Sequence, residues 1–235
     1  MPENINKTIM RFRFSKLSDM KYISHLDLIN LLIRALRRAK IQMFYSKGYH
    51  PKPKLSTAYA LKVGWESIGE YADIILSNKL LPEVFVKRIN EQLPQGLKVL
   101  KAKSVELSKS LSSQINCMRY QLIFSYNPES VRKKETDLLL KLFTENMIGF
   151  NNQLSENIKY FKEKLLNFKI RSLPDKIIMD FLIVIGSQDD LKINDLIKFL
   201  NSLHNNRKIF LKRVIRINMF RKDGDLLLNP FTLLR

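Results

Sequence analysis

Residues 22–39 read YISHLDLINLLIRALRRA, and they predict the helix around which the first half of the chain folds. Ser24 is a suitable N-cap, because its hydroxyl can accept a hydrogen bond from the free N–H groups of the first turn. Asp27, three residues later, resembles a capping box with Asp in place of Glu, and its charge suits a helix N-terminus. We therefore expect a helix that begins after Ser24 and ends at about Ala39.

The two sides of this predicted helix differ in chemistry. With 100° between successive residues, one side collects the apolar side chains Leu28, Ile29, Leu32, Ala35, Leu36 and Ala39. The opposite side carries Asn30, Arg34, Arg37 and Arg38. We expect the first side to pack on a core and the guanidinium groups of the second to face an anionic ligand.

His25 follows the N-cap and projects near the middle of the apolar side. We expect a histidine in this place to pack against a sheet and to hydrogen-bond to a backbone group. The alternative is a histidine that performs acid–base chemistry or holds a phosphate.

The segment 45–54, YSKGYHPKPK, follows the helix and is aromatic, basic and locally stiff. Gly48 permits a close backbone approach, while Pro51 and Pro53 hold the chain extended. Its aromatic rings offer stacking faces for nucleobases, and its lysines offer phosphate contacts. These side chains are Tyr45, Lys47, Tyr49, His50, Lys52 and Lys54. The segment favours single-stranded or looped RNA as its ligand; the alternative is a solvated surface loop.

Five motifs of the first half also carry a resemblance. They are RFRFSK (11–16), ISHLD (23–27), RALRRA (34–39), YSKGYHPKPKL (45–55) and GEYAD (69–73). Through them, roughly the first 105 residues resemble the radical-SAM-linked domain of unknown function. The resemblance implies a partner, a B12-type radical SAM protein to which such domains are fused or beside which they are encoded. It implies no activity for the domain itself.

The chain is strongly basic, with 41 Lys and Arg against 22 Asp and Glu in 235 residues and a formal charge of +19. Residues 1–107 hold 19 basic and 9 acidic side chains, an excess of +10, and residues 108–235 hold 22 and 13, an excess of +9. An excess spread over both halves favours a polyanionic partner, with nucleic acid preferred to a membrane.

Cysteine and histidine are too few for several kinds of site. A single cysteine, Cys117, rules out an internal disulfide and a cluster held by cysteines alone. Radical SAM chemistry requires a cysteine triad, so this chain is not the radical enzyme. The histidines, His25, His50 and His204, lack metal-site spacing, and we expect no metal or other cofactor. No long apolar run or signal peptide is visible, which predicts a cytoplasmic protein.

Hydrophobic periodicity in the first half predicts the order β-α-β-β-α-β. Strands are expected at 9–14, 56–63, 70–76 and 97–105, and helices at 24–39 and 82–92. An additional short strand is expected at 41–44. This order is that of the ferredoxin-like fold.

The second half is expected to repeat this plan without visible sequence identity. Strands are predicted at 119–126, 177–185 and 209–220, and helices at 128–146 and 193–203. Residues 147–176 have no clear pattern, and 158–170 fits a strand or a helix. The apolar tail 226–234 is expected to dock on a core. We predict an α+β protein of two tandem ferredoxin-like units with antiparallel sheets, comprising 1–107, a connector at 108–116, and 117–235.

Three functions fit these features. The favoured one is a non-catalytic module that binds ribosomal or transfer RNA through the helix arginines and the 45–54 loop and presents it to a radical SAM partner. The second is a metal-independent endoribonuclease, because two basic ferredoxin-like units resemble the repeat-processing endoribonucleases of CRISPR systems. His25 or His50 would act as the base, but residues 221–225 hold one glycine and do not match the glycine-rich loop of those enzymes. The third is a protein-interaction subunit that meets an acidic surface of the enzyme without nucleic acid.

Overall fold

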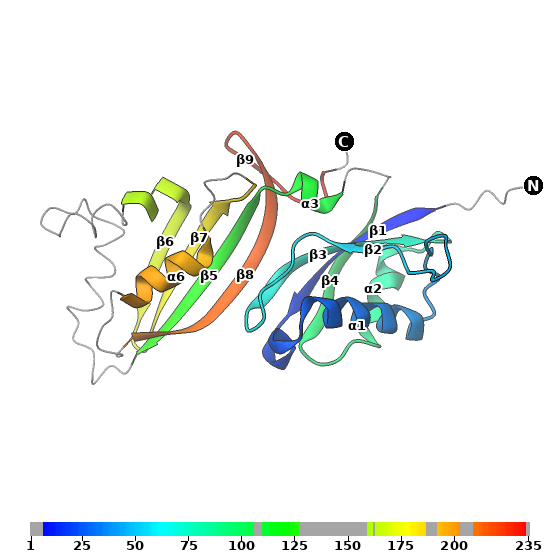
Figure 1. Ribbon diagram of the computed structural model, residues 1–235, viewed down its shortest axis with the longest axis horizontal. Coiled ribbons are helices and arrows are strands. Elements are labelled where there is room, and N and C mark those ends of the chain that lie inside the picture. The colour runs from blue at the N-terminus through cyan, green and yellow to red at the C-terminus, as the bar shows by residue number, and fades with distance from the viewer. Residues whose placement is uncertain are drawn as a thin grey trace, which may run out of the picture. The chain divides into compact units, whose positions relative to one another are not determined.

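The computed structural model describes residues 7–105, 110–126, 159–161, 163–186, 192–202 and 209–233. Its strands and helices form a mixed α+β protein with a mostly antiparallel sheet (Figure 1). The chain separates into two units: unit 1 comprises residues 1–116 and 218–235, and unit 2 comprises residues 117–217.

Strand β1 (Thr8–Lys16) organises the sheet of unit 1, because both of its edges are paired. It lies between β4 (Leu97–Val105) and β3 (Glu66–Leu76), and β2 (Leu55–Thr57) pairs with residues 72–74 of β3. The predicted strand over 56–63 is thus shorter and ends at Thr57. Past that point the chain leaves the sheet, and the amide of Gly64 donates to the carbonyl of Lys21.

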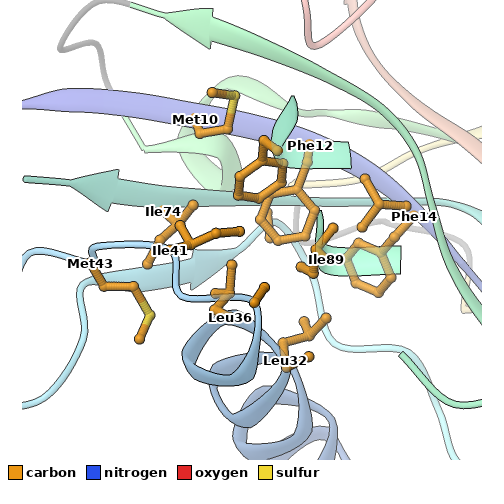
Figure 2. Close-up of a cluster of buried hydrophobic side chains, with 14 of the residues drawn as sticks. Met10, Phe12, Phe14, Leu32, Leu36, Ile41, Met43, Ile74 and Ile89 are labelled. Carbon is orange, nitrogen blue, oxygen red and sulfur yellow. The ribbon is translucent and has the colours of Figure 1, made fainter. Parts of the chain in front are cut away.

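Helices α1 (His25–Arg38) and α2 (Pro82–Asn90) cover one face of this sheet (Figure 1). A short 3-10 helix, η1 (Ser18–Tyr22), precedes α1. The core combines the even-numbered residues of β1 with the apolar side of α1 and with α2 (Figure 2). Among its fully buried members are Met10, Phe12, Phe14, Leu32, Leu36, Ile74, Phe85 and Ile89. The predicted alternation of β1 is confirmed, and so is the predicted apolar side of the helix for Leu28, Leu32, Ala35, Leu36 and Ala39. Ile29 was wrongly expected on that side: it is half-buried and lines a groove on the outer side of α1.

The C-terminal residues of the chain pack in unit 1, on side chains from the face of β1 opposite this core. Arg11 is fully buried; its Nε and Nη2 donate to the two carboxylate oxygens of Asp73 at 2.8 and 2.9 Å. Its Nη1 donates to the carbonyl oxygen of Pro230 at 2.6 Å. The ring of Phe231 meets that of Tyr71 edge-on, with 5.6 Å between centroids. These contacts place residues 218–235 with the first unit, whereas the sequence analysis placed them with the second.

Tyr71 is held in the same place by polar contacts. Its hydroxyl donates to the Oδ1 of Asn218 at 2.7 Å, and the side chain is 1% exposed. Burial raises the pKa of the Tyr71 hydroxyl, and the nearby charge of Arg13 and the Asn229 and Asn218 side chains offset part of that rise.

The predicted connector contains a short helix, α3 (Leu111–Gln114), capped by the Ser110 hydroxyl. Leu111 and Ile115 are buried, so this segment packs on unit 1 and is not only a polar linker.

Unit 2 contains β5 (Cys117–Tyr126), β6 (Leu165–Leu173), β7 (Lys176–Val184) and α6 (Ile193–Ser202). The first part of β8 (Ile209–Asp223) completes its strand order β8-β5-β7-β6. Of residues 158–170, which the sequence left open between strand and helix, 159–161 and 163–164 are helical and 165–170 belong to β6. The predicted helix at 128–146 lies outside the described residues, and the remainder of β8 continues in unit 1, where it pairs with β9 (Leu226–Leu228).

Candidate functional site

The N-terminus of α1 has the predicted cap. The amide of Asp27 donates to the Ser24 hydroxyl oxygen at 3.1 Å, and that hydroxyl donates to the Asp27 carboxylate at 2.7 Å. The Asp27 side chain therefore holds the Ser24 side chain, in place of the backbone amide that a Glu reaches in a capping box. This cap fixes the start of α1 and the direction in which its outer side faces.

A groove of about 560 Å³ runs between the outer side of α1 and the segment that leads into β2. Its cationic residues are Arg34 and Arg37 from the helix and Lys52 from the segment. The remaining lining is Leu26, Asp27, Ile29, Asn30 and Ile33 from α1 and Pro51, Pro53 and Leu55 from the segment. Asp27 is the single acidic residue among them, so the groove combines three cationic residues with a mainly apolar remainder.

The 45–54 loop next to this groove is closed by backbone contacts. Tyr45 and Pro53 form a β-bridge, and the Ser46 amide donates to the Lys52 carbonyl at 2.8 Å. The Lys52 amide donates to the Ser46 hydroxyl at 3.0 Å. These bonds form a narrow hairpin, and Gly48, with φ of +122°, allows the chain to reverse near its tip. The hairpin thereby fixes where Lys52 meets α1.

The tip of the hairpin carries an exposed aromatic pair. Tyr49 is 94% exposed, and its ring meets that of His50 edge-on with centroids 4.8 Å apart. Tyr45 is 36% exposed, and Lys47 is exposed as well. Rings that are open to solvent in this way can stack on a ligand without first leaving a core.

Two cationic residues predicted for the same surface make other contacts. The Nη2 of Arg38 donates to the carbonyl oxygen of Gln92 at 2.7 Å, so this arginine ties α1 to the end of α2. The Nζ of Lys54 lies 5.6 Å from the ring centroid of Phe44. Neither residue lines the groove. Of the six predicted cations, the structure therefore brings Arg34, Arg37 and Lys52 together.

His25 is half-buried, and its Nε2 lies 3.3 Å from the Thr57 hydroxyl. This contact joins the first turn of α1 to β2. We expected His25 to hydrogen-bond to a backbone group, and this was wrong, because the Thr57 side chain of β2 places its hydroxyl next to the ring. His25 and His50 do not line the groove.

The sequence did not predict an apolar lining for this surface, and Ile29 was assigned to the core. Leu26 is 72% exposed although it is a leucine in the first turn of a helix. A helical projection places Leu26, Ile33 and Arg37 close together in angle, and this signal was available from the spacing.

A family whose model is described as "Uncharacterized protein conserved in bacteria (DUF2344)" matches residues 10–193. The chain belongs to this family. The DUF2344 match covers α1, the 45–54 loop and every residue of the groove. No curated protein matches the chain.

Solved structures resemble this DUF2344 chain only remotely. One chain of the archaeal box H/ACA sRNP Nop10–Cbf5 complex has 8% identity and a TM-score of 0.42, over 88% of this chain and 46% of that chain. This chain thus spans about half the length of that relative. A protein described as unknown, from Galdieria sulphuraria, has 7% identity and a TM-score of 0.27, over 89% and 98% of the two chains.

Clusters of metal ligands and membrane-spanning helices are both absent from the described residues. No cluster of three or more His, Cys, Asp or Glu side chains there could hold a metal ion. No helix in the described part of this DUF2344 chain is long and apolar enough to cross a membrane.

Proposed function

We propose that this chain is a non-catalytic RNA-binding module that presents ribosomal or transfer RNA to a radical SAM partner enzyme in the cytoplasm. The observation that carries the proposal is the groove between α1 and the 51–55 segment, in which Arg34, Arg37 and Lys52 converge.

The charges of the groove favour an anionic ligand. Arg34 and Arg37 are three residues apart on one helix, where like charges repel each other. Within the part of the chain that the structure describes, neither makes an ion pair. A phosphate between them and Lys52 would relieve this repulsion and form charge-assisted hydrogen bonds with the guanidinium groups.

The apolar lining suits nucleobases. Ile33, Pro51 and Pro53 offer surface that a base can cover while its phosphate meets the cations. The exposed ring of Tyr49 lies in the adjoining hairpin and can stack on a further base. Apolar surface beside cations suits unpaired nucleotides, whose bases are free to pack on it, so the proposed ligand is a single strand or a loop.

The groove does not bear on two parts of the proposal, the radical SAM partner and the ferredoxin-like fold of the two units. The radical SAM partner follows from the motif resemblance alone. A ferredoxin-like fold for unit 1 is supported by its neighbours β4-β1-β3 and by the β2–β3 pairing. The order β8-β5-β7-β6 supports the same fold for unit 2.

A protein-interaction role is the second candidate, and one observation favours it. Leu26 in the groove and Tyr22 just before α1 are 72% and 63% exposed, as at the apolar centre of a protein interface. The endoribonuclease hypothesis has less support, because the His25 ring is engaged with Thr57 and the groove is lined by neither histidine.

The test is fluorescence anisotropy with single-stranded and hairpin RNA at several salt concentrations. We expect Arg34→Gln/Arg37→Gln to reduce the salt slope by about two units, since each lost phosphate contact removes about one. Tyr49→Ala should cost about 1–3 kcal/mol where a base stacks on the ring. Arg38→Gln removes one charge from the same helix outside the groove, and it is the control for the single variants Arg34→Gln and Arg37→Gln, each of which should reduce the slope by about one unit.

Equal affinity and equal slope in all these proteins would refute the RNA site. The purified radical SAM protein, mixed with wild type and with Leu26→Asp, then tests the second candidate. Loss of that complex in Leu26→Asp, in the absence of RNA binding, would establish the protein-interaction role.

A further inference from the structure

A second, smaller pocket lies at the C-terminal end of α1. It has a volume of about 230 Å³ and is lined by Lys40, Ile41, Gln42, Leu76, Asn78, Lys79, Leu80 and Arg88. Three of these residues are cations and none is acidic. Ile41 and Leu76 are buried, whereas Lys40, Lys79 and Arg88 are exposed. The pocket therefore has apolar residues at its base and cationic groups at its opening.

The backbone of Lys40 is the second observation. Lys40 has φ of +54°, in the left-handed region that favours glycine. The Ile41 amide donates to the Leu36 carbonyl at 3.1 Å, and the Lys40 amide donates to the Arg37 carbonyl at 3.0 Å. This is the Schellman end of a helix, in which glycine is the usual residue at the place of Lys40. The lysine is strained there, and its side chain lines the pocket.

Stabilisation of the helix end alone does not account for Lys40. Arg37 and Arg38 already place two cations in the last turn of α1, where they compensate the dipole. A backbone outlier that local stability does not require points to a function of the side chain.

The polar lining of the pocket supplies hydrogen-bond donors. The Asn78 side-chain nitrogen donates to the Oε1 of Gln42, which leaves the Gln42 amide nitrogen to donate elsewhere. Together with the two ammonium groups and the guanidinium, this set matches the acceptor oxygens of a phosphate.

We propose that this pocket is a second phosphate subsite of the RNA strand held in the groove. This inference rests on the proposed function. The two sites are joined by α1, because Arg37 lines the groove and Lys40, three residues later, lines the pocket. At 1.5 Å per residue, Arg34 lies about 6 Å from the end of α1 at Arg38, and Lys40 follows two residues later, a separation that a short single strand can span. The pocket is smaller than sites for drug-sized ligands, and a phosphate with part of its ribose suits this volume.

The experiment compares RNA binding of the full chain and its variants by anisotropy against salt. Lys79→Gln/Arg88→Gln should lower the salt slope for a long single strand by about two units relative to wild type. Lys87→Gln/Lys98→Gln is the matched control, because both lysines are exposed and line neither site. A shorter oligonucleotide that fills only the groove should not distinguish the two double variants.

Lys40→Gly provides an independent check, because it should raise stability and weaken RNA binding at the same time. Glycine removes the backbone strain and should raise the melting temperature, while the lost ammonium group should lower the salt slope by about one unit. A structural role for Lys40 alone predicts no change in RNA affinity.

Three results separate the possible failures. If the groove variants weaken RNA binding while Lys79→Gln/Arg88→Gln matches its control, the second subsite is refuted and the proposed function stands. If wild type binds no RNA, both are refuted. Saturable binding of inorganic phosphate that is lost in Lys79→Gln/Arg88→Gln, without an effect on RNA, would assign the pocket to a free anion and overturn the inference.

Discussion

Replacing Asp73 by Asn should destabilise unit 1 far more than a matched change at Asp180 destabilises unit 2. Both aspartates pair with an arginine Nε at 2.8 Å, and their side chains are similarly covered, at 12% and 14% exposed. The arginines differ: the Arg11 side chain is 0% exposed and that of Arg119 is 45% exposed. The pairs also differ in that Arg11 donates to both oxygens of Asp73 and Arg119 donates to one oxygen of Asp180, so the comparison sets a buried, two-bond pair against a solvated, one-bond pair.

The expected magnitudes follow from that difference. Asp73→Asn leaves the buried guanidinium of Arg11 without a counter-charge, and such a loss costs about 3–5 kcal/mol. Asp180→Asn removes a partner from a solvated arginine, which costs about 0–1 kcal/mol. At about 1.4 kcal/mol per tenfold change, amide protection should fall by roughly two to four orders of magnitude in β1 and β3 for Asp73→Asn.

Hydrogen exchange is the suitable assay, because it reports on β1 and β3 separately from β5 and β7. Urea unfolding followed by Trp65, the single tryptophan of the chain and a residue of unit 1, provides a second measurement for Asp73→Asn. Equal losses of protection in the two variants, or a loss below about 1 kcal/mol for Asp73→Asn, would refute the argument from burial.

Three further outcomes are expected. His25→Gln should lower stability by about 0.5–1.5 kcal/mol through the disturbed contact with Thr57 and leave RNA affinity nearly intact; lost affinity at unchanged stability would contradict this. Because burial raises the pKa of Tyr71 above its usual 10.0, the folded state keeps this proton longer than the unfolded state does. Stability from Tyr71 is thus full below pH 10 and falls as pH rises through the folded pKa, and a urea series at rising pH should show a smaller alkaline loss for Tyr71→Phe. Gly96→Ala should destabilise unit 1 more than Gly64→Ala, although both glycines have positive φ (+91° and +86°). A Cβ at Gly96 would lie 2.6 Å from the Leu17 carbonyl oxygen, whereas the space at Gly64 is open. Equal urea midpoints for the two variants would argue against this steric reason.

Local patterns predicted the parts of the fold that local chemistry determines. Ser24 and Asp27 fixed the start of α1, and the alternation of β1 placed Phe12 in the core and Arg11 on the other face. The partner of Arg11 was not predictable, because Pro230 lies 219 residues further along the chain. Periodicity describes which face a residue occupies and carries no information about which distant segment covers that face.

The candidate site was predictable to a similar depth. The outer side of α1 was correctly expected to carry Arg34 and Arg37, because helical spacing alone determines this. The hydrogen bond from Arg38 to the Gln92 carbonyl could not be predicted, because it depends on where the residues after α2 pack against α1. The left-handed backbone of Lys40 was not predicted, because the sequence signal for such a helix end is a glycine and this position holds a lysine.

The return of residues 218–235 to unit 1 has a consequence for synthesis on the ribosome. Residues 8–105 leave the ribosome first, yet the carbonyl that Arg11 requires belongs to residue 230. At 5–20 residues per second, about 6–25 s of elongation separate the two segments. During this interval Arg11 has Asp73 but lacks the Pro230 carbonyl, and Tyr71 lacks Asn218 and Phe231, so that face is open to a chaperone. The buried side of β1 is thus completed by a segment that is translated after the whole of β1 to β4.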